Sequence, residues 1–217
     1  MRKTPRTRRH HCAADRTFIQ NQSGVSAVEF ALLLPVMLTL WVGTAEMAHA
    51  MDNWRKVVLL ARTVADLNSQ GDTSDPISSA AENDILAASA AVLRPFVGAN
   101  ATIVVSALGV DTLASPLHPR VCSSGSTNSN KSARHTGLAT DLSIPPGFNV
   151  NGNRYVLAEV SMPYTPMLGT ALVRLVNGAS GSITLRSNFA WPVRNGVVHK
   201  SVTATPEVTM PGGTPCP

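Results

Sequence analysis

One apolar stretch near the N-terminus constrains this chain more than any other feature. From Phe30 to Ala45 no residue is charged, and extending the stretch back to Val25 adds only Glu29. Twenty-one residues would form about 31 Å of helix, close to the thickness of the hydrocarbon core of a bilayer. The stretch has no polar face, as a helix surrounded by lipid requires. It therefore predicts a transmembrane helix over residues 25–46, which Pro35 would kink or loosen by one turn.

The positive charge of the chain is concentrated before this stretch. The 217-residue sequence has a net charge of +5, and residues 1–24 account for all of it because they contain six basic residues and one acidic residue. A basic arm can bind nucleic acid, but a basic flank beside an apolar span holds the N-terminus in the cytoplasm. Because the apolar stretch follows directly, we predict a cytoplasmic leader over residues 1–24 and no nucleic-acid partner.

A secretory signal peptide also has a basic start and an apolar core, so the residues after Ala45 decide between the two hypotheses. One long helix from about Ser23 to Leu67 explains them better, with its first half in lipid and its second half presenting an apolar stripe to a folded domain. Arg62 and Asp66 are spaced for an ordinary surface ion pair on this helix. The predicted stripe consists of Met47, Ala48, Met51, Trp54, Val57, Val58, Ala61 and Val64.

Glu29 is the only charged residue between Val25 and Ala45. An ionisable group in an apolar helix is costly and is therefore a functional candidate. The run from Gly24 to Phe30 resembles a prepilin processing site, in which a peptidase cuts after Gly and leaves an acid at the fifth mature position. Val25 would become the new N-terminus, and its amino group would pair with Glu29 of a neighbouring subunit, which offsets the desolvation of both charges. The alternative is that Glu29 lies at the headgroup level of an ordinary anchor.

The longer run from Gly24 to Pro35, which includes Phe30, resembles the opening of TadE-like proteins. The resemblance covers about residues 23–67. Later segments that are similar to the strands closing the family's extracytoplasmic domain are less specific: Tyr155–Tyr164, Ser182–Phe189 and Trp191–Arg194. Four positions fall where the family has its second signature, namely Gly43, Glu46, Ala61 and Arg62.

The resemblance implies a minor pseudopilin that takes part in tight-adherence (Tad) pilus assembly or secretion. Its partners would be the lipid bilayer, a prepilin peptidase that cuts after Gly24, other pilins or pseudopilins, and Tad assembly components. The protein would lie in the bacterial inner membrane or enter a pilus, with its N-terminus cytoplasmic and residues 47–217 periplasmic or extracytoplasmic. The alternative is an uncleaved, membrane-tethered binding or adhesion domain with no role in fibre assembly.

Residues 47–217 are predicted to form an α+β domain. Asp75 as the cap and Pro76 in the first turn predict a second helix, which ends at Pro95. Its apolar face would pack beside residues 54–67 of the long helix.

The remaining elements favour a small antiparallel sheet with helices packed on one face. Residues 115–146 are dominated by Ser, Asn, Gly and Pro and predict a long mobile loop. Residues 168–176, followed by Asn-Gly, predict a short helix. Strands are predicted over residues 101–108, 155–161 and 182–189.

The three cysteines are divided by the predicted span. Cys12 lies in the leader, whereas Cys122 and Cys216 lie beyond the span and would share an oxidising compartment. A disulfide between them would close a loop of about 90 residues and stabilise the domain by roughly 4 to 5 kcal/mol in the chain-entropy model. Two free thiols are the alternative.

No set of residues in the sequence predicts catalysis. The six histidines include no pair at the spacing of metal ligands on a helix. His118, His135 and Cys122 would form a metal site only if folding brought them together, and exposed loop positions explain them better. There is no nucleophile elbow, P-loop or Rossmann glycine pattern. We therefore predict that the protein is not an enzyme and has no cofactor and no metal.

Overall fold

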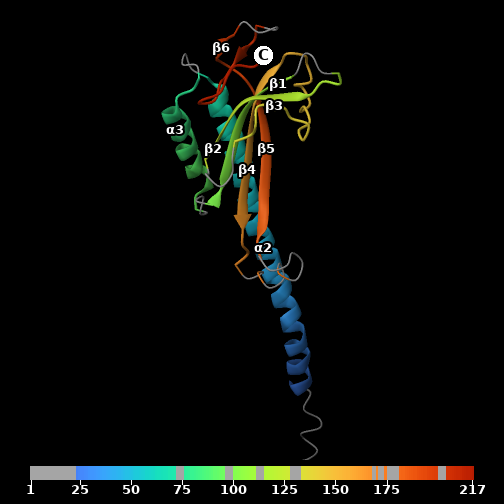
Figure 1. Cartoon of the computed structure of the whole chain (residues 1–217). Coiled ribbons are helices and arrows are strands. Elements are labelled where there is room, and N and C mark those ends of the chain that lie inside the picture. The colour runs from blue at the N-terminus through green and yellow to red at the C-terminus, as the bar shows by residue number, and fades with distance from the viewer. Residues whose placement is uncertain are drawn as a thin grey trace, which may run out of the picture. The chain divides into compact units, whose positions relative to one another are not determined.

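The computed structural model divides the chain into two compact units, Met1–Ala45 and Glu46–Pro217 (Figure 1). The described part of the first unit consists of residues 23–45, which begin helix α2. The predicted leader over residues 1–24 lies almost entirely outside the described residues, as does most of the predicted helix over 168–176. The structure describes residues 23–71, 76–95, 100–110, 115–127, 133–167, 170, 174, 181–199 and 204–217.

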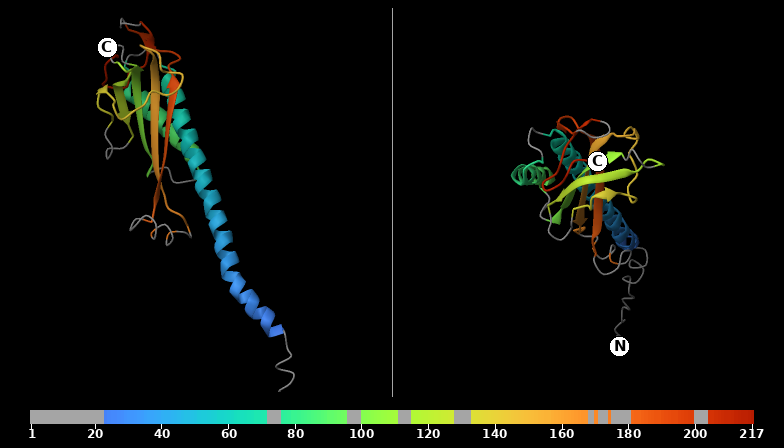
Figure 2. Two further views of the ribbon diagram at one scale, coloured as in Figure 1. Left: turned by 90° about the vertical axis from the view of Figure 1, so that its right-hand side faces the viewer. Right: turned by 45° about the horizontal axis from the view of Figure 1, so that its top comes forward.

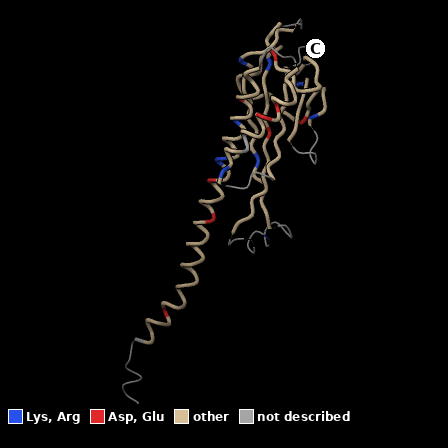
Figure 3. The backbone as a smooth tube through the Cα atoms, turned by 90° about the vertical axis from the view of Figure 1, so that its left-hand side faces the viewer, with Lys and Arg blue, Asp and Glu red and all other residues tan. Residues whose placement is uncertain are grey.

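Helix α2 (Ser23–Ser69) is the long continuous helix that the sequence predicts. It runs through Pro35 without ending, and the Thr39 hydroxyl donates a 2.7 Å hydrogen bond to the Pro35 carbonyl oxygen. By length and composition it is able to cross a membrane, with an apolar window of mean hydropathy 2.0. None of this window is buried inside the protein, in contrast to the core helix of a soluble domain. The first half of α2 carries almost no charge, whereas charged positions are frequent in its second half (Figure 3).

The second half of α2 buries a stripe that only partly coincides with the predicted one. The prediction is confirmed for Val57, Ala61 and Val64. It is wrong for Met47 and Trp54, which are 64% and 51% exposed, and for the neighbouring Met51. At about 100° per residue, Met47 and Val57 lie about 80° apart around the helix, so the apolar residues occupy two faces. The buried residues of α2 are Asn53, Val57, Leu60, Ala61, Val64, Ala65, Asn68 and Ser69.

The second unit contains a five-stranded antiparallel sheet in the order β3-β2-β1-β4-β5, and this confirms the predicted α+β class. The three predicted strands are present as β1, β4 and β5, each longer than predicted. A separate pair, β6 and β7, lies near the C-terminus. The strands are β1 (Thr102–Val110), β2 (Pro119–Ser126), β3 (Gly137–Leu138), β4 (Arg154–Tyr164), β5 (Ile183–Pro192), β6 (Val197–Val198) and β7 (Pro206–Glu207).

The prediction of one long loop over residues 115–146 is wrong at β2 and β3. β2 is rich in serine, and its strand character comes from partners that lie far away in the sequence. The Ser124 hydroxyl lies 2.8 Å from the Ser106 hydroxyl of β1, and Ser123 accepts a 2.9 Å hydrogen bond from the backbone N–H of Met210. Local composition does not report these contacts, so β2 resembles a loop in the sequence.

The second predicted helix is present as α3 (Ser79–Ala90), but it begins later than predicted. Its cap is Ser78, whose hydroxyl accepts a hydrogen bond of 3.1 Å from the N–H of Ala81. The buried Ile77 precedes the helix because its N–H donates to the carbonyl oxygen of Thr209 at 2.9 Å. The predicted cap, Asp75, lies outside the described residues. A 3₁₀ turn, η1 (Ala91–Leu93), follows α3.

Hydrophobic clusters cover both faces of the sheet. The larger cluster joins residues of α2 and α3 to residues of β1 and β4. The two helices lie on the same side of the sheet (Figure 2). The C-terminal segment contributes Val208 and Met210 to this cluster. The smaller cluster lies on the opposite face, where Tyr155 and Leu157 of β4 pack under residues 139–148. The prediction of helices on one face is therefore confirmed, and an irregular segment covers the other.

Candidate functional site

The predicted processing segment forms the first turns of α2. Val25 and Phe30 are 58% and 61% exposed, and Glu29 is also exposed. Glu29 has no ion-pair partner among the residues that the structure describes. A Cβ placed on Gly24 would meet no atom within 4 Å. The packing of the chain therefore gives no reason for a glycine at position 24, and the acid at position 29 stays available to a cation from another molecule.

The second signature begins with two residues at the boundary between the units. Gly43 resembles Gly24 in that nothing lies within 4 Å of a Cβ built there. Glu46 accepts a 3.2 Å hydrogen bond from the hydroxyl of Tyr164, the last residue of β4. Burial raises the pKa of this hydroxyl, and the charge of Glu46 raises it further. Glu46 thus attaches the end of β4 to α2.

The other two signature residues hold α2 against the sheet. Ala61 is fully buried in the larger cluster. The Arg62 guanidinium lies over two rings of β5, 5.8 Å from the centroid of Phe189 and 5.3 Å from that of Trp191. The predicted ion pair between Arg62 and Asp66 is wrong, because Asp66 pairs with Arg194 at 3.0 Å instead. Tertiary neighbours on β5 therefore replace the local partner expected from helical spacing.

Residues 24–66 match the model of the family described as TadE-like protein. The match begins at the predicted processing glycine and contains Glu29 and all four positions of the second signature. It confirms the resemblance recognised in the sequence. The match covers 43 of the 217 residues, all of them in α2. No curated protein and no solved structure matches the chain.

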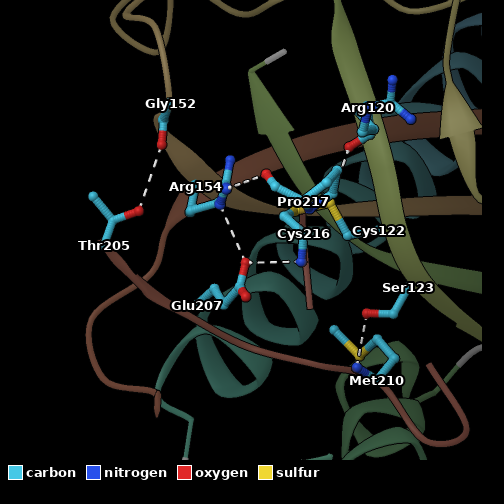
Figure 4. The surroundings of a disulfide bond; sticks show 10 residues. All are labelled: Arg120, Cys122, Ser123, Gly152, Arg154, Thr205, Glu207, Met210, Cys216 and Pro217. Atoms are coloured by element: carbon cyan, nitrogen blue, oxygen red, sulfur yellow. Dashed lines mark hydrogen bonds and ion pairs between the residues drawn. A yellow bond between two sulfur atoms is a disulfide. The ribbon is translucent and has the colours of Figure 1, made fainter. Parts of the chain in front are cut away.

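Outside the TadE-like segment, a disulfide joins Cys122 of β2 to Cys216 (Figure 4). Their Cα atoms are 4.9 Å apart, and both residues are buried. The structure therefore has the bridge rather than the two free thiols. Because the sulfur of Cys122 is used in the disulfide, a metal site of Cys122, His118 and His135 is excluded. Across the described ranges, no three His, Cys, Asp or Glu residues are placed to hold a metal ion.

A buried ion pair lies beside the disulfide and was not predicted. Nε of Arg154 donates to the Glu207 carboxylate at 3.1 Å, and both side chains are about 5% exposed or less. The same carboxylate accepts the N–H of Cys216 at 3.2 Å, and Arg154 also donates to the Pro217 carbonyl oxygen (Figure 4). A side chain at Gly109 would collide with the Arg154 guanidinium. Together these contacts hold the C-terminal segment against the sheet.

A second charged cluster that was not predicted lies on the sheet face opposite α2. Arg134 binds the Glu159 carboxylate through Nε and Nη2, and it binds Asp141 at 2.7 Å. The hydrogen bond to Glu159 contributes most to raising the pKa of Arg134, and Arg134 in turn lowers the pKa of Asp141. These residues and His135 line a hollow of about 420 Å³. The three charges pair with one another, so the cluster stabilises the loop after β2 and has no assigned ligand.

Proposed function

We propose that the chain is a minor pseudopilin-like membrane protein that takes part in Tad pilus assembly or secretion. In this proposal α2 spans the bacterial inner membrane over residues 25–46, and a prepilin peptidase removes residues 1–24. The other partners are pilins or pseudopilins and Tad assembly components, which the chain contacts through its membrane helix.

One observation carries the proposal. An acid lies in the otherwise apolar and unburied first half of α2, five residues after a glycine that the packing of the chain does not require. A lone carboxylate in lipid is costly unless a cation offsets its charge. Cleavage after Gly24 would create such a cation at the amino group of Val25, and Glu29 of a neighbouring subunit would pair with it.

The disulfide supports the proposed orientation. Disulfides form and persist in oxidising compartments such as the periplasm and are rare in the cytosol. Cys122 and Cys216 both lie in residues 47–217, whereas the excess of basic over acidic residues lies in residues 1–24, on the other side of the span. An excess of basic residues marks the cytoplasmic side of a membrane helix. Both features support a cytoplasmic N-terminus and an extracytoplasmic domain.

Replacement of Gly24 tests the processing step. We expect Gly24→Ala to abolish cleavage, so that mass spectrometry of the protein from membranes finds residues 1–24 still attached. Gly43→Ala is the matched control, because both glycines lie in α2 with nothing within 4 Å of an added Cβ. The control should begin at Val25 like the unaltered protein. A wild-type protein that begins at any other residue would refute the processing proposal.

Replacement of Glu29 tests the assembly step. We expect Glu29→Gln to be cleaved normally and to enter the membrane, but to lose pilus formation because a neutral amide cannot pair with the amino group of Val25. Cleavage and pilus assembly are then scored separately, by mass spectrometry and by electron microscopy of shed fibres. Normal fibres in this variant would favour the tethered binding or adhesion domain over the pseudopilin.

A further inference from the structure

The tip of the β4–β5 hairpin has a fixed position along α2. The last residue pair of the hairpin is Tyr164 opposite Ile183. The Tyr164 hydroxyl donates its 3.2 Å hydrogen bond to Glu46, which is the residue after Ala45. Ala45 is the last residue of the uncharged stretch. The hairpin tip therefore lies level with the helical turn that leaves the apolar part of α2.

This end of the domain exposes apolar side chains. Met167, three residues beyond the end of β4, is 82% exposed, and Ile183 is 39% exposed. On the adjoining turn of α2, Met47 is 64% exposed. Tyr164 has an apolar ring and a polar hydroxyl, a combination that is enriched where a membrane meets water. Such a group of exposed apolar residues at one end of a domain indicates a contact surface for a protein or a membrane.

The charge at the tip favours a lipid surface as the covering material. Between Tyr164 and Ile183 the sequence contains no acidic residue and one basic residue, Arg174, whose side chain is exposed. Basic residues near a membrane are attracted to anionic phospholipid headgroups. Apolar side chains beside a basic residue are typical of segments that lie in the interface between headgroups and acyl chains.

We propose that the hairpin tip is a second membrane contact of this protein, with Tyr164, Met167 and Ile183 lying in the outer headgroup region beside Met47. The proposal rests on the membrane anchoring proposed above, because the level of the tip is set relative to the apolar stretch of α2. The domain is then held at two points, by its helix and by its hairpin, and the second contact limits how far the domain can tilt relative to the membrane surface. The Tyr164–Glu46 hydrogen bond joins the two points.

Spin labels at three positions test this contact. The full chain with Cys12→Ser is placed at one copy per nanodisc of phosphatidylethanolamine and phosphatidylglycerol, and single cysteines are labelled at Met167, Val150 or Leu38. Val150 is the matched control, because it is apolar and 62% exposed but lies before the start of β4, whose 11 residues span about 35 Å. Leu38 reports the anchor. Collision with oxygen and with a water-soluble nickel complex gives the depth of each label.

We expect the Met167 label to collide several-fold less with the nickel complex than the Val150 label, and more with oxygen. A Met167 label with the same accessibility as Val150, while Leu38 is in lipid, overturns the hairpin contact and leaves the anchor intact. A Met167 label shielded from both reagents overturns it as well, because protein and not lipid then covers the tip. A water-exposed Leu38 label refutes the anchor itself and with it the proposed function.

Discussion

Removal of the Cys122–Cys216 disulfide should strongly destabilise the domain. The bridge joins residues 94 positions apart, and both cysteines are buried, so the bond ties the C-terminal segment to β2. In the chain-entropy model, a loop of this length reduces the entropy of the unfolded chain by an amount equivalent to about 4.7 kcal/mol at 25 °C. Domains have unfolding free energies of about 5–15 kcal/mol. We therefore expect removal of the disulfide to lower the free energy of unfolding by at least about a third of its total value.

Urea unfolding of the full chain in mild detergent measures this loss. The fluorescence of Trp191 reports the domain, because its ring packs 5.6 Å from that of Phe189 and lies under Arg62. Cys122→Ser/Cys216→Ser and the reduced wild-type protein should both lose about 4–5 kcal/mol, and Cys12→Ser should lose nothing. A loss below about 1 kcal/mol in the reduced protein would refute the reasoning, because it would mean that the loop closure does not restrict the unfolded chain.

Two further predictions concern buried charges. Burial raises the pKa of Glu82 above its ordinary value of 4.5, so the folded protein binds this proton more tightly and the free energy of unfolding falls as pH rises from 4.5 through the folded pKa. The Glu82→Gln variant should lose that part of the pH dependence and be more stable than the wild type at pH 7. Urea unfolding at several pH values from 4 to 8 measures this, and a free energy of unfolding that depends on pH as in the wild type contradicts the prediction. Arg154→Met leaves the buried Glu207 without its partner and should cost about 3–5 kcal/mol. Adding Glu207→Leu should restore most of the loss, and no recovery would show that the charge is not the cause.

The helical part of the fold was predictable because its causes are local. α2 follows from a run of apolar residues too long and too uniform for any other element, and its bounds agree with the prediction to within two residues at its end. β1, β4 and β5 were predictable because β-forming residues run through them. The prediction for β2 failed because a serine hydroxyl can form hydrogen bonds in a loop as well as in a strand. Only the pairing of this segment with β1 makes it a strand.

The candidate site divides in the same way. The predictions for Gly24 and Glu29 needed only their spacing, because the chemistry proposed for them lies within a few residues of one helix, and they stay predictions. The roles of Glu46 and Arg62 could not be predicted, because their partners Tyr164 and Trp191 are more than a hundred residues away in the sequence. The buried ion pair of Arg154 and Glu207 could not be predicted either, because no local sequence pattern indicates it.

The sequence by itself determined that this chain has a basic N-terminal segment, an apolar helix able to span a bilayer, and an acid placed within that helix. These properties depend on hydrophobicity and charge summed over neighbouring residues, and no folding is needed to reveal them. The tertiary structure decided that the two distant cysteines meet, that a serine-rich segment is a strand, and that the end of β4 lies against Glu46. Each of these depends on contacts between residues far apart in the chain, which form only when the sheet and α2 pack together.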